Sequence, residues 1–213
     1  MAARDYGQSS GITRALELIG ERWALLIVRD LLVGPRRYGE LAAGLPRIPT
    51  NILASRLKEL QEAGVLRRAP RSRVIVYELT PFGRELEPVV LALGAWGFKA
   101  MGGARDEQAI SPDSMTMDLR SAFRPEAAAG LPPTAYAARL DAAELLIRVD
   151  GPALDVQRGP GPADLVFEGG RAIHRLITGE IAPQRAITDG LVRVRSGDGL
   201  LLDRFATTFR LAA

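Results

Sequence analysis

The chain has 213 residues, of which 47% are apolar and 25% charged, as in a soluble globular protein of one large or two small domains. It contains no cysteine, which excludes disulfides, thiol-based redox sensing and cysteine-ligated metals. The net charge of +3 is unevenly placed: residues 1–102 carry 15 Lys and Arg against 10 Asp and Glu, whereas residues 103–213 carry 13 against 15.

Targeting signals are absent from the sequence as it stands. The first residues contain no apolar core of signal-peptide length, and no run approaches the roughly 18 apolar residues of a membrane span. We therefore expect a cytoplasmic protein with no membrane partner.

The first elements form a series of short helices. Ser10 is expected to cap a helix that runs to about Ile19 and ends at Gly20. A second helix is predicted over 22–32. A short strand at 36–38 is expected to pair with a later hairpin, and 38–43 and 44–49 are predicted as the first helix and the turn of a helix-turn-helix motif.

A recognition helix is predicted to begin at Pro49 and to stop before Gly64. Leu53, Leu57 and Leu60 recur at helical spacing and define its buried stripe. Short polar residues near the start of such a helix suit base edges, and later cations suit phosphates. An ordinary amphipathic helix is the alternative. The residues off the stripe are Thr50, Asn51, Ser55, Lys58 and most of Arg56.

A basic hairpin follows the helix. Its strand-forming residues are interrupted by Pro70, and Ser72 is placed at the tip. A cluster of cations on a hairpin is typical of a polyanion-binding surface, although a solvated loop has the same composition. The position directly after the recognition helix favours a DNA-binding wing. The arginines of this cluster are Arg67, Arg68, Arg71 and Arg73.

One long helix is predicted to start at Thr80 and Pro81. It is more apolar than a small domain needs, so we interpret it, together with the N-terminal helix, as a dimerisation element. Packing against the second half of the chain is the alternative. The apolar set is Phe82, Leu86, Val89, Val90, Leu93, Trp96 and Gly97.

A linker is predicted at 103–113, between a domain at 1–102 and a domain at 114–213. The second domain begins with helix over 114–130 and continues with five strands separated by Gly-Pro turns. Helices are expected at 172–177, 181–188 and 200–211. The predicted fold class is therefore α+β: a winged helix-turn-helix domain, then a domain with a five-stranded, mostly antiparallel sheet covered by helices.

The first half resembles the HxlR-type winged helix-turn-helix regulators over about residues 6–100. The resemblance implies a MarR-like, cytoplasmic, homodimeric, DNA-binding regulator. Many members carry a cysteine just before the first helix, where this chain has Ser10, so a thiol mechanism is not available. The matching segments are ALELIGERW (15–23), LLIVRDL (25–31), GPRRYGEL (34–41), LPRIPTN (45–51), RLKEL (56–60), EAGV (62–65), YELT (77–80) and GREL (83–86).

The second half resembles the sterol carrier protein type-2-like domain through shorter pieces in the right order. They are LIRVDG (146–151), ADLVF (163–167), LITG (176–179), Pro183, Ala186, DGLVRV (189–194) and GD (197–198). The resemblance implies a sheet with helices that can enclose an apolar ligand. A solid core would use the same residues. The candidate lining residues are Leu146, Val149, Phe167, Ile173, Leu176, Phe205 and Phe209.

Catalytic chemistry has no clear sequence signature. His174 is the only histidine, so no multi-histidine metal site can form, and we expect it to be structural or to line a pocket. No nucleophile elbow or phosphate loop is present. We expect no cofactor, no metal and no enzymatic activity.

The leading hypothesis is a homodimeric transcriptional regulator that binds double-stranded DNA and is controlled by a small apolar effector in its second domain. One alternative is a lipid or small-molecule carrier whose winged helix serves dimerisation only. Another is a second domain that acts purely as a dimer clamp. The expected DNA contacts are Arg37, Thr50, Asn51, Ser55, Arg56, Lys58, Arg71 and Arg73.

Overall fold

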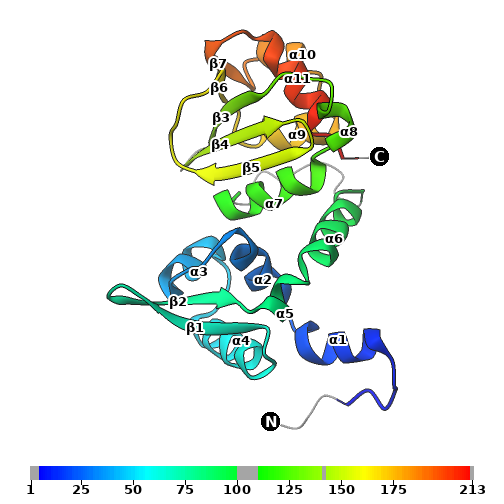
Figure 1. Ribbon diagram of the computed structural model, residues 1–213, viewed down its shortest axis with the longest axis vertical. Helices are drawn as coiled ribbons and strands as arrows, with labels where there is room; N and C mark the ends of the chain where they lie inside the picture. The colour runs from blue at the N-terminus through cyan, green and yellow to red at the C-terminus, as the bar shows by residue number, and fades with distance from the viewer. Residues whose placement is uncertain (1–4, 100–109, 141–142, 212–213) are drawn as a thin grey trace. The chain divides into compact units, whose positions relative to one another are not determined.

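The computed structural model describes residues 5–99, 110–140 and 143–211, and the chain divides between Val90 and Leu91 into two compact units. The fold is α+β, as predicted: a two-stranded sheet with helices comes first, and a five-stranded sheet with helices follows. Figure 1 shows both units. The expected boundary at 102 and most of the expected linker at 103–113 lie outside the described residues.

The first two helices form close to where the sequence predicts them. In α1 (Gly11–Ile19), the hydroxyl of Ser10 accepts a hydrogen bond from the Thr13 N–H at 3.0 Å, which satisfies one exposed donor of the first turn. The second helix, α2 (Ala24–Val33), begins two residues later than predicted. Trp23 has a φ of +81°, a left-handed conformation that cannot belong to the helix, so the helix starts after it.

The helix-turn-helix motif consists of α3 (Tyr38–Gly44) and α4 (Thr50–Glu62). The second helix ends before Gly64, whose φ of +71° suits glycine, as predicted. Leu53, Leu57 and Leu60 are fully buried, which confirms the predicted stripe. Burial of each leucine contributes about 1.5–3 kcal/mol, so this stripe fixes which face of α4 remains outside.

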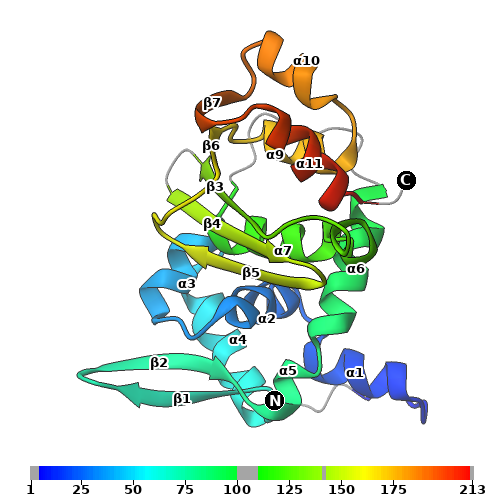
Figure 2. The ribbon, with the colours of Figure 1, turned by 45° about the horizontal axis from the view of Figure 1, so that its top comes forward.

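The wing is the antiparallel hairpin of β1 (Leu66–Arg71) and β2 (Val74–Leu79), with Ser72 at its tip as predicted. Arg36 exchanges two backbone hydrogen bonds with Tyr77, at 3.0 and 2.7 Å, which confirms the predicted pairing at this position. Pro70 does not break the strand. It lies opposite Ile75 within β1. Both strands of a two-stranded ribbon are edge strands, which tolerate a residue without an N–H. Figure 2 shows the hairpin projecting from the helices of its unit.

The predicted long helix after Thr80 is two helices, α5 (Pro81–Arg84) and α6 (Glu87–Lys99). Pro88 explains the interruption, because a proline has no N–H for the carbonyl of Arg84 and its ring would clash there. No residue of α6 is buried. The helix runs from the first unit into the second, because the chain divides after Val90.

The second unit contains the five predicted strands, in the order β5-β4-β3-β6-β7. Only the β3–β6 pair is parallel, which confirms a mostly antiparallel sheet. The strands are β3 (Thr134–Leu140), β4 (Ala143–Asp150), β5 (Ala153–Arg158), β6 (Leu165–Glu168) and β7 (Arg193–Gly197). The helices are α7 (Pro112–Ala122), α8 (Pro125–Ala128), α9 (Ala172–Thr178), α10 (Pro183–Thr188) and α11 (Leu200–Thr208).

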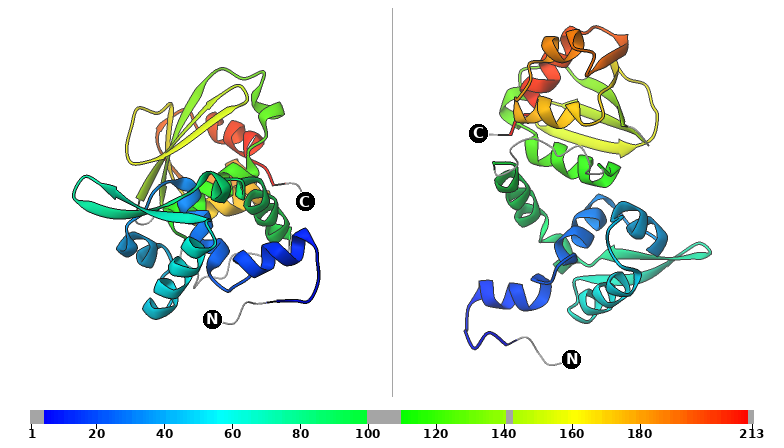
Figure 3. Two further views of the ribbon diagram at one scale, coloured as in Figure 1. Left: turned by 60° about the horizontal axis from the view of Figure 1, so that its bottom comes forward. Right: turned by 180° about the vertical axis from the view of Figure 1, so that it is seen from behind.

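The core of the second unit lies on one face of its sheet. Tyr136 of β3 pairs with Ile147 of β4, and Phe167 of β6 lies on the same face, opposite Ala138; these side chains pack with Leu119 and Phe205 from the helices. Figure 3 shows α9 and α11 beside the sheet. The opposite face is largely polar because strand side chains alternate between faces. The prediction of helices covering the sheet is therefore confirmed.

Candidate nucleic-acid interface

The exposed side of α4 carries short polar residues near its N-terminus. Thr50 and Asn51 are exposed, and Lys58 lies further along the same helix, also exposed. The hydroxyl of Tyr38 donates to the Thr50 carbonyl oxygen at 2.8 Å, which ties α3 to the start of α4. Ser55 is half-buried, and its hydroxyl donates to Glu59 at 2.9 Å. Side chains of this size at the start of a helix can reach base edges in a major groove.

A buried glutamate organises two of the wing arginines. Glu78 is only 6% exposed, and its carboxylate accepts hydrogen bonds from Arg67 and Arg71, each at 2.8 Å. Hydrogen bonds from Arg71 and then Arg67 hold the pKa of Glu78 below its ordinary value of 4.5. Both guanidiniums remain more than half exposed, so they are oriented by Glu78 without being withdrawn from solvent.

The other two wing arginines have no such partner. Arg68 lies on the opposite side of the ribbon from Arg67, because adjacent strand residues point to opposite faces, and Arg73 follows Ser72 at the tip. Both are exposed, and within 5–99, 110–140 and 143–211 neither is ion-paired. The wing therefore presents four guanidiniums against one carboxylate.

Arg56 is placed differently from the prediction. It is buried, 8% exposed, and its guanidinium pairs with Glu59 and, at 3.3 Å, with Glu21. The expectation that most of Arg56 lies off the buried stripe is wrong, because Glu21 from the segment before α2 draws the side chain inward. A buried and paired arginine holds helices together and is not available to a phosphate.

The remaining predicted cations are accessible. Arg37 is exposed at the start of α3, where its backbone N–H donates to Glu40 at 2.6 Å. Lys58 is 3.8 Å from Glu62 in an exposed pair, which contributes little to stability and leaves the ammonium accessible. The structure thus brings the wing arginines together and places Arg37 and Lys58 on α3 and α4 of the same unit.

Glu78 is the important residue that the sequence interpretation missed. A two-residue connection at Ser72 and Arg73 sets the hairpin register and places Arg67 opposite Glu78. A hairpin with this two-residue connection places Arg67 and Glu78 directly opposite each other, so their pairing can be predicted from the sequence.

The seven predicted ligand-lining residues are all buried. Six of them belong to the core, where the rings of Phe167, Phe205 and Phe209 pack at centroid distances of 5.3 and 4.7 Å. Leu146 lies on the other face of the sheet, in close contact with Gly161 of the β5–β6 connection. These side chains act as a packed interior.

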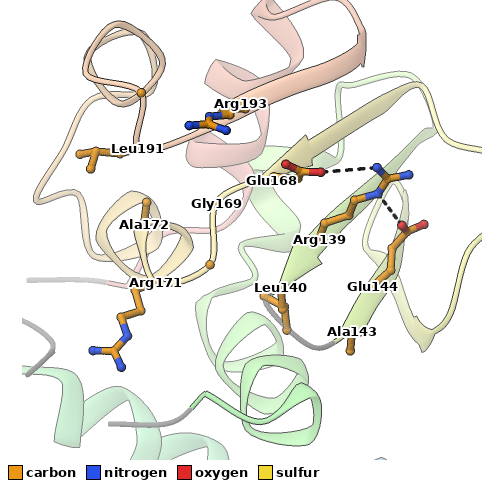
Figure 4. Close-up of a pocket in the computed structure, with 12 residues that line it drawn as sticks. Arg139, Leu140, Ala143, Glu144, Glu168, Gly169, Arg171, Ala172, Leu191 and Arg193 are labelled. Carbon is orange, nitrogen blue, oxygen red and sulfur yellow. Dashed lines mark hydrogen bonds and ion pairs between the residues drawn. The ribbon is translucent and has the colours of Figure 1, made fainter. Parts of the chain in front are cut away.

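An open pocket of about 720 Å³ lies at the end of β3 and β4, beside the turn before α9. Figure 4 shows Arg139 of this pocket between Glu144 and Glu168, with Arg193 near Glu168. Hydrogen bonds and charge, led by those of Arg195, lower the pKa of Glu168. The wall of this pocket therefore consists largely of arginines and glutamates that pair with one another.

His174 has a structural environment, as expected. Its Nε2 is 2.9 Å from a carboxylate oxygen of Asp118, and the ring packs edge-on against Phe98. No group of three or more metal-ligating side chains occurs in the described ranges. In the same ranges, no helix is both long and apolar enough to span a bilayer.

Comparisons with known proteins point to the first unit. Residues 18–104 match the family model described as HxlR-like helix-turn-helix. An uncharacterized HTH-type transcriptional regulator of Mycobacterium tuberculosis strain H37Rv is 41% identical over 123 residues, which cover 56% of this chain and 71% of the relative.

Two solved structures are also similar to part of this chain. The crystal structure of a putative HTH-type transcriptional regulator ytcD is 35% identical, covering 43% of this chain and 97% of its own, with a TM-score of 0.41. The redox regulator HypR in its reduced form is 31% identical, covering 44% and 95%, with a TM-score of 0.41.

Proposed function

The chain belongs to the HxlR-like helix-turn-helix family, and we propose that it is a homodimeric regulator that binds double-stranded DNA through α4 and the wing. The observation that carries this proposal is the unbalanced positive charge of the wing, in the same unit as an exposed polar helix face. Clustered guanidiniums recognise phosphates, and a helix beside them reads the major groove.

The two elements have different tasks in this proposal. Asn51, together with Thr50 and Ser55, contacts base edges and gives sequence preference. Arg56 is excluded because it is buried in ion pairs. Positioning contacts to phosphates come from Arg37, Lys58, Arg67, Arg68, Arg71 and Arg73.

Selection of bound fragments from random DNA tests this proposal. We expect a recovered site with two half-sites about 34 Å apart, one for each recognition helix of a dimer. Asn51→Ala should flatten the base preference at one position of each half-site, by about 1–3 kcal/mol, while the salt dependence stays unchanged. Failure to retain any DNA at low salt would instead favour a carrier protein whose winged helix only dimerises.

The homodimer is supported by apolar side chains left exposed on three helices. They are Ile12 and Leu16 of α1, Phe82 of α5, and Val89 and Leu93 of α6. Exposed apolar surface of this extent marks an interaction site. Leu93→Glu should convert the protein to monomer in sedimentation equilibrium, whereas Leu200→Glu, at a more exposed leucine of α11, should leave the dimer intact.

We propose that the second unit carries effector control without a thiol, since the chain has no cysteine. An effector that binds one dimer geometry better than another would change the spacing of the two recognition helices and so the affinity for DNA. The order of the strands and the helices on one face are compatible with a sterol carrier protein-like domain. Six of the seven residues predicted to line an apolar site pack in the core of this unit, and their role as an effector site stays a prediction.

A further inference from the structure

A second pocket of about 730 Å³, here called the α6 pocket, lies entirely within the second unit. Its walls come from the C-terminal half of α6, the junction of α7 and α8, and the segment after α11. The lining residues are Ala92, Ala95, Trp96, Lys99, Ser121, Phe123, Arg124, Glu126, Arg210 and Leu211.

The α6 pocket combines aromatic rings with an excess of positive charge. Trp96 and Phe123 contribute rings, and Trp96 is 68% exposed, so its indole is available to a ligand. Lys99, Arg124 and Arg210 line the pocket together with one carboxylate among its described residues, Glu126, which pairs with Arg124 at 3.0 Å. Within residues 5–99, 110–140 and 143–211, neither Lys99 nor Arg210 is paired with a carboxylate.

The position of Arg210 depends on a glycine. Gly179, at a φ of +74°, ends α9, and a Cβ at this residue would come within 2.0 Å of the Arg210 guanidinium. Only a residue without a side chain allows the guanidinium to lie there. Gly179 therefore leaves room for the Arg210 guanidinium beside the α6 pocket.

The pocket of Figure 4 differs in both respects. No aromatic side chain lines it, and Arg139 is already paired with Glu144 and Glu168. A ligand there would have to compete with an existing ionic network. The α6 pocket offers stacking surface and cations without that competition.

We propose that the α6 pocket binds a planar aromatic anion, such as an aromatic carboxylate. The ring stacks on Trp96 and Phe123, and the carboxylate accepts hydrogen bonds from Lys99 and Arg210. This inference deepens the proposed function, on which its regulatory meaning rests. α6 also carries Leu93 of the proposed dimer surface, so a ligand against Trp96 acts on the helix that sets dimer geometry.

Tryptophan fluorescence gives a direct test, because Trp23 and Trp96 are the only two tryptophans. In a Trp23→Phe background, titration with 2-naphthoate should quench Trp96 saturably. The neutral isostere 2-naphthamide should bind at least about tenfold more weakly, because it lacks the charge that Lys99 and Arg210 recognise. Isothermal titration calorimetry of the same pair of compounds provides an independent affinity.

Charge variants locate the site. Arg210→Met and Lys99→Met should each weaken 2-naphthoate binding several-fold, with little change for 2-naphthamide, whereas Arg158→Met, at an exposed arginine of β5, should change neither. Equal affinity for the two compounds, or no quenching of Trp96, would overturn the proposal.

These binding measurements use no DNA, so their failure is separate from failure of the proposed function. If the protein binds DNA but not 2-naphthoate, only the proposed ligand site in the α6 pocket is wrong. A protein that binds 2-naphthoate but no DNA would lose the regulator function and keep the site.

Discussion

Two glutamates, one in each unit, are each paired with two arginines but differ in what the pairing leaves on the surface. In the wing, Glu78 accepts hydrogen bonds from Arg67 and Arg71. In the second sheet, Glu168 pairs with Arg139 and Arg195. The pKa of both carboxyl groups is lowered by these arginines. The local chemistry of an arginine-glutamate cluster therefore does not distinguish a DNA-binding surface from an ordinary sheet face.

The balance of charge around each glutamate does distinguish them. Arg139 also pairs with Glu144, so two arginines and two glutamates form a neutral group on the sheet. The wing adds Arg68 and Arg73 with no further carboxylate, and its surface keeps a net positive charge. Of the 28 Lys and Arg residues of the chain, 26 are arginines, and each half contains 13 of them. Arginine content alone therefore does not distinguish a DNA-binding surface from an ordinary sheet face.

The largest effect is expected from removing the two wing arginines that have no carboxylate partner. Arg68→Ala with Arg73→Ala should weaken DNA binding for all sequences by at least about tenfold near 0.1 M salt, and should lower the salt slope by about 2 per protomer. Fluorescence anisotropy with labelled duplexes at several salt concentrations measures both quantities.

The matched control removes the same number of charges from the sheet. Arg139→Ala with Arg195→Ala should leave DNA affinity and its salt slope unchanged, since both arginines are already paired with glutamates of the sheet. If the two double variants weaken DNA binding equally, the net charge of the protein governs binding, and the proposed difference between the wing and the second sheet is wrong.

A smaller effect of opposite sign is expected at Glu78. Glu78→Gln keeps the shape of the side chain but removes one negative charge, so the wing gains a positive charge that phosphates can use. Non-specific DNA affinity should rise by about two- to fivefold, with a slope steeper by at most about 1 per protomer. Glu168→Gln adds the same charge to the second unit and should alter neither value in the same anisotropy assay.

Local patterns in the sequence were sufficient for α4 and for several helix ends of the first unit. Leu53, Leu57 and Leu60 define the face of α4 that must be buried, and Ser10 and Gly64 mark helix ends through their own backbone and capping chemistry. Each of these inferences uses residues within one or two helical turns. They are confirmed because the interactions that decide them are equally local.

Arg56 and Pro88 show where local patterns fail for different reasons. The burial of Arg56 depends on Glu21, which is distant in sequence, so no helical periodicity could reveal it. Pro88 was sufficient to predict the interruption before α6, but the apolar residues on both sides of it recur at helical spacing and favoured one continuous helix. In the second unit, apolar residues that could line a cavity are the same ones that fill a core, so the sequence does not distinguish the two; in the structure Phe167, Phe205 and Phe209 pack against one another.

The smallest effect concerns stability and pH. A carboxyl group whose pKa is lower in the folded than in the unfolded protein stabilises the fold above its unfolded pKa, and this contribution is lost as pH falls through the folded pKa. Wild type should therefore exceed Glu78→Gln in free energy of unfolding at pH 7, and the difference should shrink as pH falls below 4.5. Urea titration measures it without screening the ion pairs.

The same sign applies to Glu168, and the two tryptophans separate the units. Trp23 lies in the first unit and Trp96 in the second, so single-tryptophan variants report each unit's unfolding. Glu78→Gln should change the transition seen by Trp23, and Glu168→Gln the transition seen by Trp96. A stability difference at Glu78 that is independent of pH would mean that hydrogen-bond shape, and not the charge shared with Arg67 and Arg71, holds the wing together. The wing and the sheet would then differ in their bonding as well as in their balance of charge.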